Sequence, residues 1–459
     1  MTDDHPNDAT TPSPKPKRYR PDSEHDADQT PRGPHASNLL PFPVSDDSSI
    51  PPAPPSRRPH RRYGTGSSVV TSSSVTSASA QSDTALSYQS SPSKTRKRRR
   101  QSSPRKQQRL MVMEMAVETA TFGGPDDPPE ALDVLVSRIE DFSRGDAILS
   151  PTLKEPMNAE QRANRRQFKW VTDRSFAPIL SKSASPSRPD REELGPSPSI
   201  SKAKSLWSAA DDCYKFQHFE SQWNHVVHSR ILRAAFKHSS LIDFCSITGA
   251  AIHKDYTRTE TPSHFNRKVD FCDFVNVETP ELRATALGSP FHSVNHTEYP
   301  ALLHRPIAMS IETKVPGDDW ADAVNQLSAW LVAQWDVLDD LVLRAGDGDA
   351  PLLPAKPSSS AGLGTDNNDR RPRPSAAAAA GLSFLPGIIV QGHEWYFIAV
   401  TRAAADGHTQ RWEKVLIGST QWMEGVYKIV AVLQLLGHWV EHEFWPWFQL
   451  AVLRLQGAN

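Results

Sequence analysis

Apolar positions become dense only from about Leu206 onward, and from there their spacing switches between helical and strand-like periods. From Lys215 to Lys237 they recur with the period of a helix, so we expect a helix there. Three short runs rich in β-branched and aromatic residues follow, and each predicts a strand. These runs are LIDFCSI, KVDFCDFVNV and PIAMSIETKV.

The C-terminal half continues in the same manner. A second helical period runs from Trp320 to Leu343, and residues 345–380 are an insertion rich in Gly, Pro, Ser and Ala that we expect to be disordered. The runs GIIVQGHEWYFIAVT and KVLIGS predict two strands, and a last helical region spans about Thr420 to Leu455. The order of helix, three strands, helix, two strands and helix predicts an α/β (α+β) fold, with a mixed central sheet flanked by helices.

The N-terminal part has a different composition. Residues 1–110 are rich in Ser, Pro, Thr, Arg and Asp and hold too few apolar residues to offset the entropy of ordering them, so we expect a disordered tail. Residues 111–205 are interpreted as a partly helical linker, with a candidate helix in PEALDVLVSRIEDF. The folded domain is therefore expected at 206–455. The low hydrophobic fraction of 37% and the 39 prolines fit this mixture.

A dense basic run lies in the tail. Lys94–Arg100 carries six positive charges in seven residues, and a weaker cluster lies at Lys15–Arg18. Such a run predicts either a nuclear import signal read by an import receptor or a solvated charge run. We favour import and hence a nuclear location. The net charge of -1 does not discriminate between partners.

Cysteine usage and apolar run lengths exclude several protein classes. The three cysteines are far apart and unpaired in pattern, so neither a disulfide framework nor a zinc finger is expected, and a reducing compartment fits. The N-terminus has no basic-then-apolar leader pattern, and no apolar run is long enough to predict a membrane span.

The candidate chemistry lies on two of the predicted strands. Successive strand residues point to opposite faces, so Asp270 and Asp273 lie on different faces and only one can join a given site. Glu312 and Lys314 share one face of the PIAMSIETKV strand. Two carboxylates beside a lysine would bind a hard divalent cation through oxygen. Such an ion polarises a phosphoryl oxygen, and the lysine would orient water or offset phosphate charge.

These residues resemble the fungal branch of the PD-(D/E)XK nuclease superfamily over about Leu206–Leu455. The resemblance rests on four segments: Lys268-Val269-Asp270, Ser310-Ile311-Glu312-Thr313-Lys314, Gln326-Leu327-Ser328-Ala329-Trp330 and Leu385–Trp395. Two positions depart from the pattern of the family. Val269 replaces the Pro of the name, and Trp330 replaces the Tyr of the Q-x-x-x-Y element.

The resemblance implies a restriction-endonuclease-like core that hydrolyses nucleic-acid phosphodiester bonds, with DNA as the expected substrate. It implies Asp270 and Glu312 as ligands of Mg²⁺ (or Mn²⁺) and Lys314 as the catalytic lysine. Glu220, on the first core helix, is the best match for a further carboxylate ligand, and Gln326 for the glutamine of the site.

Plainer interpretations stay open for each residue. Asp270 could be a structural carboxylate at a strand end, and Glu220 could be an ordinary polar residue of an amphipathic helix. Glu312 and Lys314 could form an exposed ion pair that contributes little to stability. Asp273 is expected to be structural. At the level of the whole protein, the rival interpretations are a catalytically inactive module of the same fold that binds nucleic acid or a protein, and a scaffold that acts through its tail.

Two histidine patterns suggest other metal sites. His225 and His228 are three residues apart on a predicted helix, and we expect a solvated helix face there. His438-Trp439-Val440-Glu441-His442 matches the inverted zincin pattern of zinc proteases. That pattern needs a third protein ligand. Downstream of it the chain offers only the adjoining Glu443, so the protease alternative is disfavoured.

Overall fold

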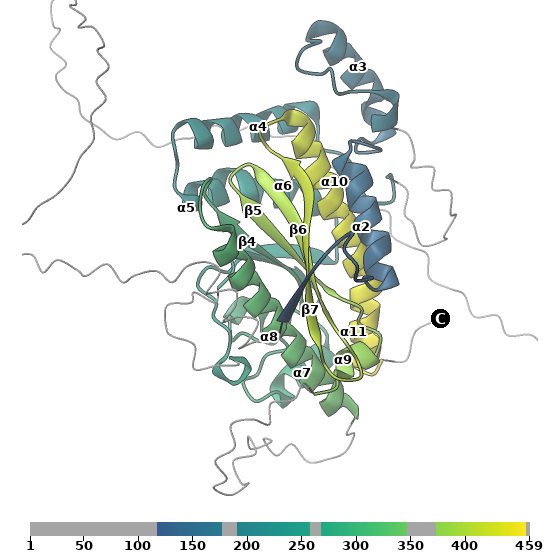
Figure 1. Cartoon of the computed structure of the whole chain (residues 1–459), viewed down its shortest axis with the longest axis vertical. Coiled ribbons are helices and arrows are strands. Elements are labelled where there is room, and N and C mark those ends of the chain that lie inside the picture. Colours follow the sequence, from purple (N-terminus) through teal and green to yellow (C-terminus); the bar gives the residue numbers. More distant parts are fainter. Residues whose placement is uncertain (1–116, 177–190, 258–267, 347–372, 456–459) are drawn as a thin grey trace, which may run out of the picture. The chain divides into compact units, whose positions relative to one another are not determined.

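The computed structural model describes residues 117–176, 191–257, 268–346 and 373–455, which hold one seven-stranded mixed sheet. The strands lie in the order β1-β7-β6-β5-β4-β3-β2 (Figure 1). The pairs β1–β7 and β4–β5 are parallel and the other four are antiparallel. The strand bounds are β1 Val117–Thr121, β2 Ile242–Ser246, β3 Phe271–Val275, β4 Ile307–Lys314, β5 Leu385–Gln391, β6 Glu394–Arg402 and β7 Thr409–Ser419.

Helices cover both faces of this sheet. One face packs against α8, and the other packs against α2, α6 and α10, with α4 resting on α10 (Figure 1). The predicted mixed sheet flanked by helices is therefore confirmed. The helix bounds are α2 Glu130–Ser143, α3 Lys154–Ala163, α4 Ile200–Lys215, α5 Glu220–Trp223, α6 Ser229–Phe236, α7 Pro280–Gly288, α8 Trp320–Gly346, α9 Ala376–Ala379, α10 Met423–Trp439 and α11 Trp445–Ala451.

Helix α8 forms the crossover that lets β4 and β5 pair in parallel. Polar side chains tie it to the sheet at several points. Trp335 Nε1 donates to the Val400 carbonyl at 3.1 Å, and the buried Arg402 guanidinium on β6 lies 2.8 Å from a carboxylate oxygen of Asp336 and of Asp339. These bonds hold α8 against β6, the strand beside β5, and so fix the position of the helix that covers β4.

The sheet begins earlier in the chain than the expected boundary near Leu206. Strand β1 pairs with β7, with Val117 beside Thr409, and α2 packs on the same strand. Val117 and Ala120 are buried by this pairing. Residues Val117–Thr121 of the expected linker thus form an edge strand of the sheet. The predicted disordered tail 1–110, with the basic run Lys94–Arg100, lies outside the described residues.

The run GIIVQGHEWYFIAVT forms two strands where one was expected. The turn between β5 and β6 falls at Gly392, which has a φ of 60°, and a Cβ there would lie 2.5 Å from a side-chain atom of Pro316. Only glycine fits both the positive φ and the contact. Of the expected insertion 345–380, residues 347–372 lie outside the described residues, whereas α9 is ordered within its C-terminal part.

The helix predicted from Lys215 to Lys237 is interrupted. Helix α4 ends at Lys215, Gln217 has a φ of 50°, and a new helix starts with α5 at Glu220. Asn224–His228 then forms a π-helical turn before α6. A second such turn, Val440–Phe444, divides α10 from α11 in the last helical region. Within the described residues, none of these helices combines the length and apolar character needed to span a membrane.

Strand β3 carries an aspartate in a fully buried position. Asp273 pairs with Met309 of β4, and neither of its carboxylate oxygens has a hydrogen-bond partner among the described residues. Burial raises its pKa well above the ordinary value, and Cys245 and Asp243 raise it further. Cys245 itself faces Cys272 across β2 and β3, with their sulfurs 3.8 Å apart. Burial thus favours the protonated form of Asp273 in the folded protein.

We expect Asp273 to make the stability of the fold fall as pH rises. Its folded pKa lies above its unfolded value of about 3.9, so its contribution is complete below that pH and is lost as pH rises toward the folded pKa. Asp273→Asn should remove this loss. Denaturant unfolding at a series of pH values should show the wild type losing up to about 1.4 kcal/mol per pH unit relative to the variant. Asp133→Asn, at an exposed position of α2, serves as control, and parallel curves for wild type and Asp273→Asn would refute the assignment.

Candidate active site

The carboxyl end of β4 presents Glu312 and Lys314 toward α8. Ser310 on β4 lies beside Gly387 on β5 in parallel register, and a Cβ on Gly387 would meet Leu327 of α8. Residues two apart on a strand share a face. Ser310, Glu312 and Lys314 therefore share the α8 face of the sheet, and Glu312 is 2% exposed while the tip of β4 leaves Lys314 half-buried.

Asp270 approaches this strand end from the neighbouring strand. It directly precedes β3, and its backbone N–H donates to the Ile311 carbonyl at 3.0 Å, which places it opposite Glu312. Its carboxylate accepts from the Thr313 backbone N–H at 2.9 Å and lies 2.8 Å from the Thr313 hydroxyl. These bonds fix Asp270, which is 7% exposed, at the end of β4.

Glu220 supplies a third carboxyl group because the chain breaks its helix just before it. The loop after α4 lets a new helix begin at Glu220, the first residue of α5. Burial raises the pKa of Glu220 to about 7, and Asp270 raises it as well, whereas Lys314 opposes the rise. Glu220 is therefore close enough to both Asp270 and Lys314 to interact with them electrostatically.

Asp270 and Glu220 disfavour the ionisation of Glu312. Burial raises the pKa of Glu312 to about 8; Lys314 opposes this rise, whereas Asp270 and Glu220 add to it. Burial also raises the pKa of Asp270 despite its bonds from Thr313. Burial alone would lower the pKa of Lys314, but Glu312, Glu220 and Asp270 together outweigh it and raise the pKa above its ordinary value. Lys314 is thus a cation at neutral pH, hydrogen-bonded to Glu312.

Gln326 lies near this cluster without joining it. Asp322 lies on the first turn of α8, and burial raises its pKa while the charge of Lys314 opposes that rise. This end of the helix therefore borders the site. Gln326 is one turn further along the same face. Its Oε1 atom is buried without a hydrogen-bond partner among the described residues. The structure therefore brings Glu220, Asp270, Glu312 and Lys314 together and leaves Gln326 beside them.

A second group of residues, which the sequence interpretation missed, holds Asp270 in place. Asn224 lies one turn after Glu220, and its Oδ1 atom is 3.0 Å from the Thr313 hydroxyl, while its side chain also hydrogen-bonds Asp270. His228, one turn further, lies with Nδ1 2.8 Å from Asn224 Oδ1. The sequence carries one weak signal, the recurrence of polar residues at 220, 224 and 228, which also fits the polar positions of an ordinary amphipathic helix.

His228 is buried and neutral. Burial lowers its pKa to about 3, and its ring lies against Trp223 and Trp395. His225 is exposed, so the pair does not form a shared metal site, and only His225 fits the expected solvated face. Because Asn224 Oδ1 is an acceptor, the neutral ring donates from Nδ1. The π-helical turn Asn224–His228 lets this one helical segment carry both Glu220 and the residues that orient Asp270.

The donor set suits a hard divalent cation in its chemistry but is not arranged around one. Among the described residues, no group of three or more His, Cys, Asp or Glu side chains is placed to hold a metal ion. The Glu312 carboxylate accepts a hydrogen bond from Lys314, and the Asp270 carboxylate accepts one from Thr313. The buried Asp270 and Glu312 and the half-buried Glu220 would nevertheless be stabilised in their ionised forms by a divalent cation with oxygen ligands. Side-chain rotation of Glu312 away from Lys314 would open that arrangement.

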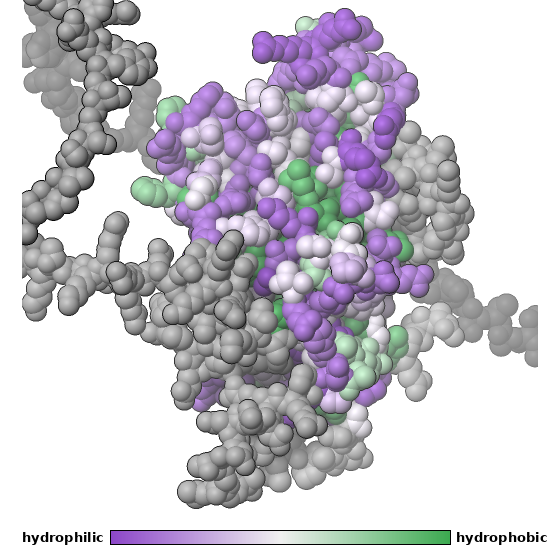
Figure 2. Space-filling view, in the orientation of Figure 1, coloured by the Kyte–Doolittle hydropathy of each residue, from purple (hydrophilic) through white to green (hydrophobic). Residues whose placement is uncertain are grey.

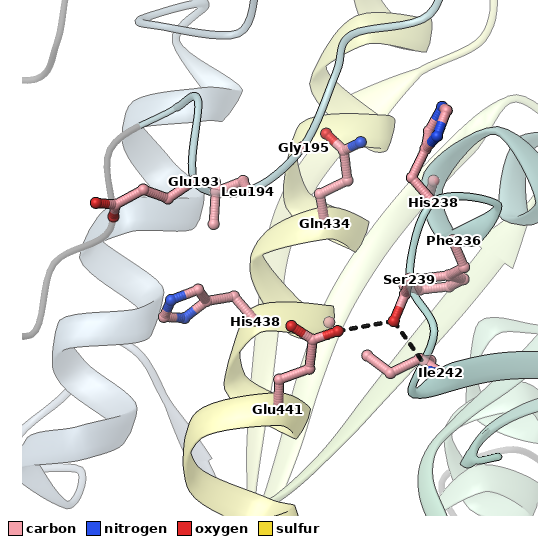
Figure 3. A pocket seen from close by; sticks show the side chains of 12 residues that line it. Glu193, Leu194, Gly195, Phe236, His238, Ser239, Ile242, Gln434, His438 and Glu441 are labelled. Atoms are coloured by element: carbon pink, nitrogen blue, oxygen red, sulfur yellow. Dashed lines mark hydrogen bonds between the residues drawn. The ribbon is translucent and has the colours of Figure 1, made fainter. Parts of the chain in front are cut away.

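The inverted zincin pattern lies at a separate pocket. A cavity of about 140 Å³ lies between α10, the 193–195 loop and the α6–β2 connection, with His438 and Glu441 in its wall (Figure 3). The Ser239 hydroxyl donates to Glu441 at 2.7 Å, and the rings of His438 and His442 stack with centroids 3.9 Å apart. The described residues provide no third ligand that would complete a zinc site there.

Comparison with known proteins gives one match. The model of the PD-(D/E)XK nuclease superfamily matches residues 169–445, well over half of the chain. The matched segment contains Glu220, Asp270, Glu312 and Lys314. No curated protein and no solved structure matches the chain.

We expect Asn224, which helps to hold Asp270 in position, to control the affinity of the site for divalent ions. Asn224→Ala keeps every carboxylate but frees Asp270 and Thr313 from Asn224, so Mn²⁺ affinity measured by calorimetry should fall about tenfold, the scale of losing such a supporting residue. Asp270→Asn, which replaces a ligand oxygen, should weaken binding further. Gln222→Ala, at an exposed position on the same helix, is the control. An Asn224→Ala affinity equal to that of wild type would remove Asn224 from this role.

Proposed function

We propose that this chain, which belongs to the PD-(D/E)XK nuclease superfamily and has its restriction-endonuclease-like fold, hydrolyses nucleic-acid phosphodiester bonds at the end of β4. The observation that carries the proposal is the convergence of Glu220, Asp270, Glu312 and Lys314 at one buried strand end. Nucleases of this superfamily generally use divalent metals, and three carboxyl groups offer the oxygen ligands such ions prefer. DNA is the proposed substrate, and Mg²⁺ or Mn²⁺ the proposed ion.

Each residue has a distinct role in this proposal. Asp270, Glu312 and Glu220 would hold the ion, and Thr313 and Asn224 keep Asp270 in position. When bound, the ion supplies Lewis-acid polarisation of a phosphoryl oxygen and lowers the pKa of water. Gln326, beside the cluster on α8, is proposed to contact the nucleophilic water or the phosphate.

Lys314 is proposed to act as a cation rather than as a base. Its pKa is raised by Glu312, so it keeps its proton at neutral pH and cannot accept another from water. A fixed ammonium beside the reacting phosphate stabilises the negative charge that develops in the transition state. Its hydrogen bond to Glu312 holds it at the strand end until the phosphate and the ion arrive.

The alternative is a catalytically inactive module of the same fold that binds nucleic acid or a protein partner. One observation favours it: Glu312 and Asp270 are engaged by Lys314 and Thr313, so no ready-made metal site exists among the described residues. Cleavage assays on single-stranded, duplex, flap and blunt-ended nucleic acids, with Mg²⁺ and with Mn²⁺, separate the two functions.

Substituting Lys314 separates chemistry from binding. Lys314→Ala should keep most affinity for Mn²⁺ and nucleic acid, because an ammonium has no lone pair to offer a metal. Cleavage should fall about 10²-fold or more, the scale for loss of a preorganised electrostatic group. Lys314→Arg should rescue poorly because the guanidinium is planar and places its charge differently.

Lys169→Ala, an exposed lysine remote in sequence, is the matched control for this experiment and should cleave at the wild-type rate. Equal cleavage by wild type and Lys314→Ala would exclude this site as the catalytic one. Binding without cleavage across the whole substrate panel would favour the inactive module.

We further propose that the protein acts in the nucleus, carried there by an import receptor that binds Lys94–Arg100. Support comes from the charge density of this run in the sequence. Alanine at Lys97, Arg98, Arg99 and Arg100 should shift a fluorescent fusion of the full chain toward the cytoplasm. The control places alanine at Lys15, Lys17 and Arg18, the weaker cluster. A fully nuclear fusion after the first set of changes would show the assignment to be wrong.

A further inference from the structure

Strongly exposed aromatic side chains gather at the end of the sheet that bears the candidate site. In the described part of the chain these are Phe219 (85% exposed), Phe216 (70%), Trp422 (66%) and Tyr214 (55%). Figure 2 shows small hydrophobic groups at the corner where α4 meets α5, with mainly hydrophilic residues directly around them. Rings exposed to this extent contribute little to the core, so their place on the surface calls for another account.

These rings are linked to the site through neighbouring residues. Phe219 immediately precedes the carboxylate Glu220. The ring of Tyr214 lies 5.1 Å from that of His393, at the turn whose Gly392 N–H donates to the Lys314 carbonyl at 2.8 Å. Thr420 Oγ1 lies 2.9 Å from His393 Nδ1, and Trp422 follows two residues later. The exposed rings therefore form a rim beside Glu220 and Lys314.

The backbone holds these rings away from the core. Helix α4 stops at Lys215, and the positive φ of 50° at Gln217 turns the chain so that Phe216 and Phe219 flank the turn. Gln217 and His218, which are polar, lie between the two rings in the sequence, and the ring of Phe216 lies 6.1 Å from that of His218. Exposed rings offer their faces to planar groups, whereas a stable protein interface uses a contiguous apolar core.

Charge at this rim is of both signs. Asp211 and Glu394 lie close enough to His393 to oppose the lowering of its pKa by burial. The Lys215 ammonium is bonded to Asp211. Attraction to phosphates would therefore be a weak source of affinity at this position.

We propose that Phe216, Phe219 and Tyr214, with Trp422 at the far side of the rim, stack on unpaired bases of a nucleic-acid strand whose backbone enters the candidate site. This proposal rests on the proposed function and names its substrate class: single strands, flaps or frayed ends. Bases within a duplex have both faces covered by their neighbours, whereas an unpaired base offers a face to a ring. The stacking chemistry is shared by DNA and RNA.

The test measures binding of the full-length chain without divalent ion, so that cleavage does not interfere. Fluorescence anisotropy compares oligo-dT, oligo-U and a hairpin duplex. The double variant Phe216→Ala, Phe219→Ala should lose about tenfold or more in affinity for the single strands, and less than about twofold for the duplex. Phe216→Tyr with Phe219→Tyr should bind like wild type, because the rings remain. Leu287→Ala with Leu343→Ala, at two exposed aliphatic positions elsewhere, is the control.

Salt dependence makes the test sharper. Ring stacking releases no counterions, so the ratio of wild-type to double-variant affinity should be the same at about 50 mM and about 200 mM salt. Equal losses on duplex and single strand, no loss at all, or a ratio that vanishes at the higher salt would each overturn the proposal. Ring-dependent self-association in sedimentation, with unchanged oligonucleotide affinity, would also overturn it and assign the rim to a second copy of the chain.

The two proposals can fail separately. Cleavage of duplex and single strand alike, unaffected by the ring variants, would leave the nuclease function intact and refute the stacking rim. Ring-dependent binding of single strands without cleavage of any substrate would support the rim and refute the nuclease function.

Discussion

Glu312 is 2% exposed and has two further carboxyl groups near it, and this burial of like charge constrains the rest of the site. In a medium of low polarity each ionised carboxylate raises the cost of ionising the next. The protein offsets the cost with one half-buried cation, Lys314, and with hydrogen bonds from Thr313 to Asp270. A divalent cation would offset it more completely, which is why such a cluster suits metal-dependent chemistry.

The architecture delivers these groups to one point from elements far apart in the sequence. Strand β4 lies inside the sheet, between β3 and β5, so its end is fixed on both sides. Helix α8 closes one face and is held to β6 by the Arg402 ion pairs. On the other side of β4, one helical face carries Glu220, Asn224 and His228 to the same point. Tight positioning of this kind is what electrostatic catalysis requires.

Much of this arrangement follows from local sequence pattern. The alternation in PIAMSIETKV predicts the strand β4 and places Glu312 and Lys314 on one face, and the apolar period after Trp320 predicts α8. Other features depend on contacts that no local pattern encodes. The sequence of β1 alone predicts part of a helical linker, and its strand structure depends on pairing with β7, which lies far along the chain. The turn at Gly392 interrupts a run that is apolar on both sides, and the helix break at 216–219 does not interrupt the apolar period.

The residues that orient Asp270 were equally hidden. Because successive strand residues point to opposite faces, Thr313 is expected on the face opposite Glu312. Nothing in the sequence indicates that the Asp270 carboxylate accepts a hydrogen bond from the Thr313 backbone N–H. Asn224 and His228 look like ordinary polar positions of an amphipathic helix. Their role appears only when the helix is packed against the end of β4, where a buried polar side chain must find a partner.

The π-helical turn at Asn224–His228 has a consequence for how this chain can vary in evolution. Such a turn holds one residue more than the α-helical turn it replaces. Deleting a single residue there would rotate Glu220 by about 100° around the helix axis relative to α6, carrying it away from Asp270 while α6 kept its packing. Insertions and deletions in this short segment should therefore be as rare among descendants as loss of a carboxylate itself, whereas its exposed positions can drift freely.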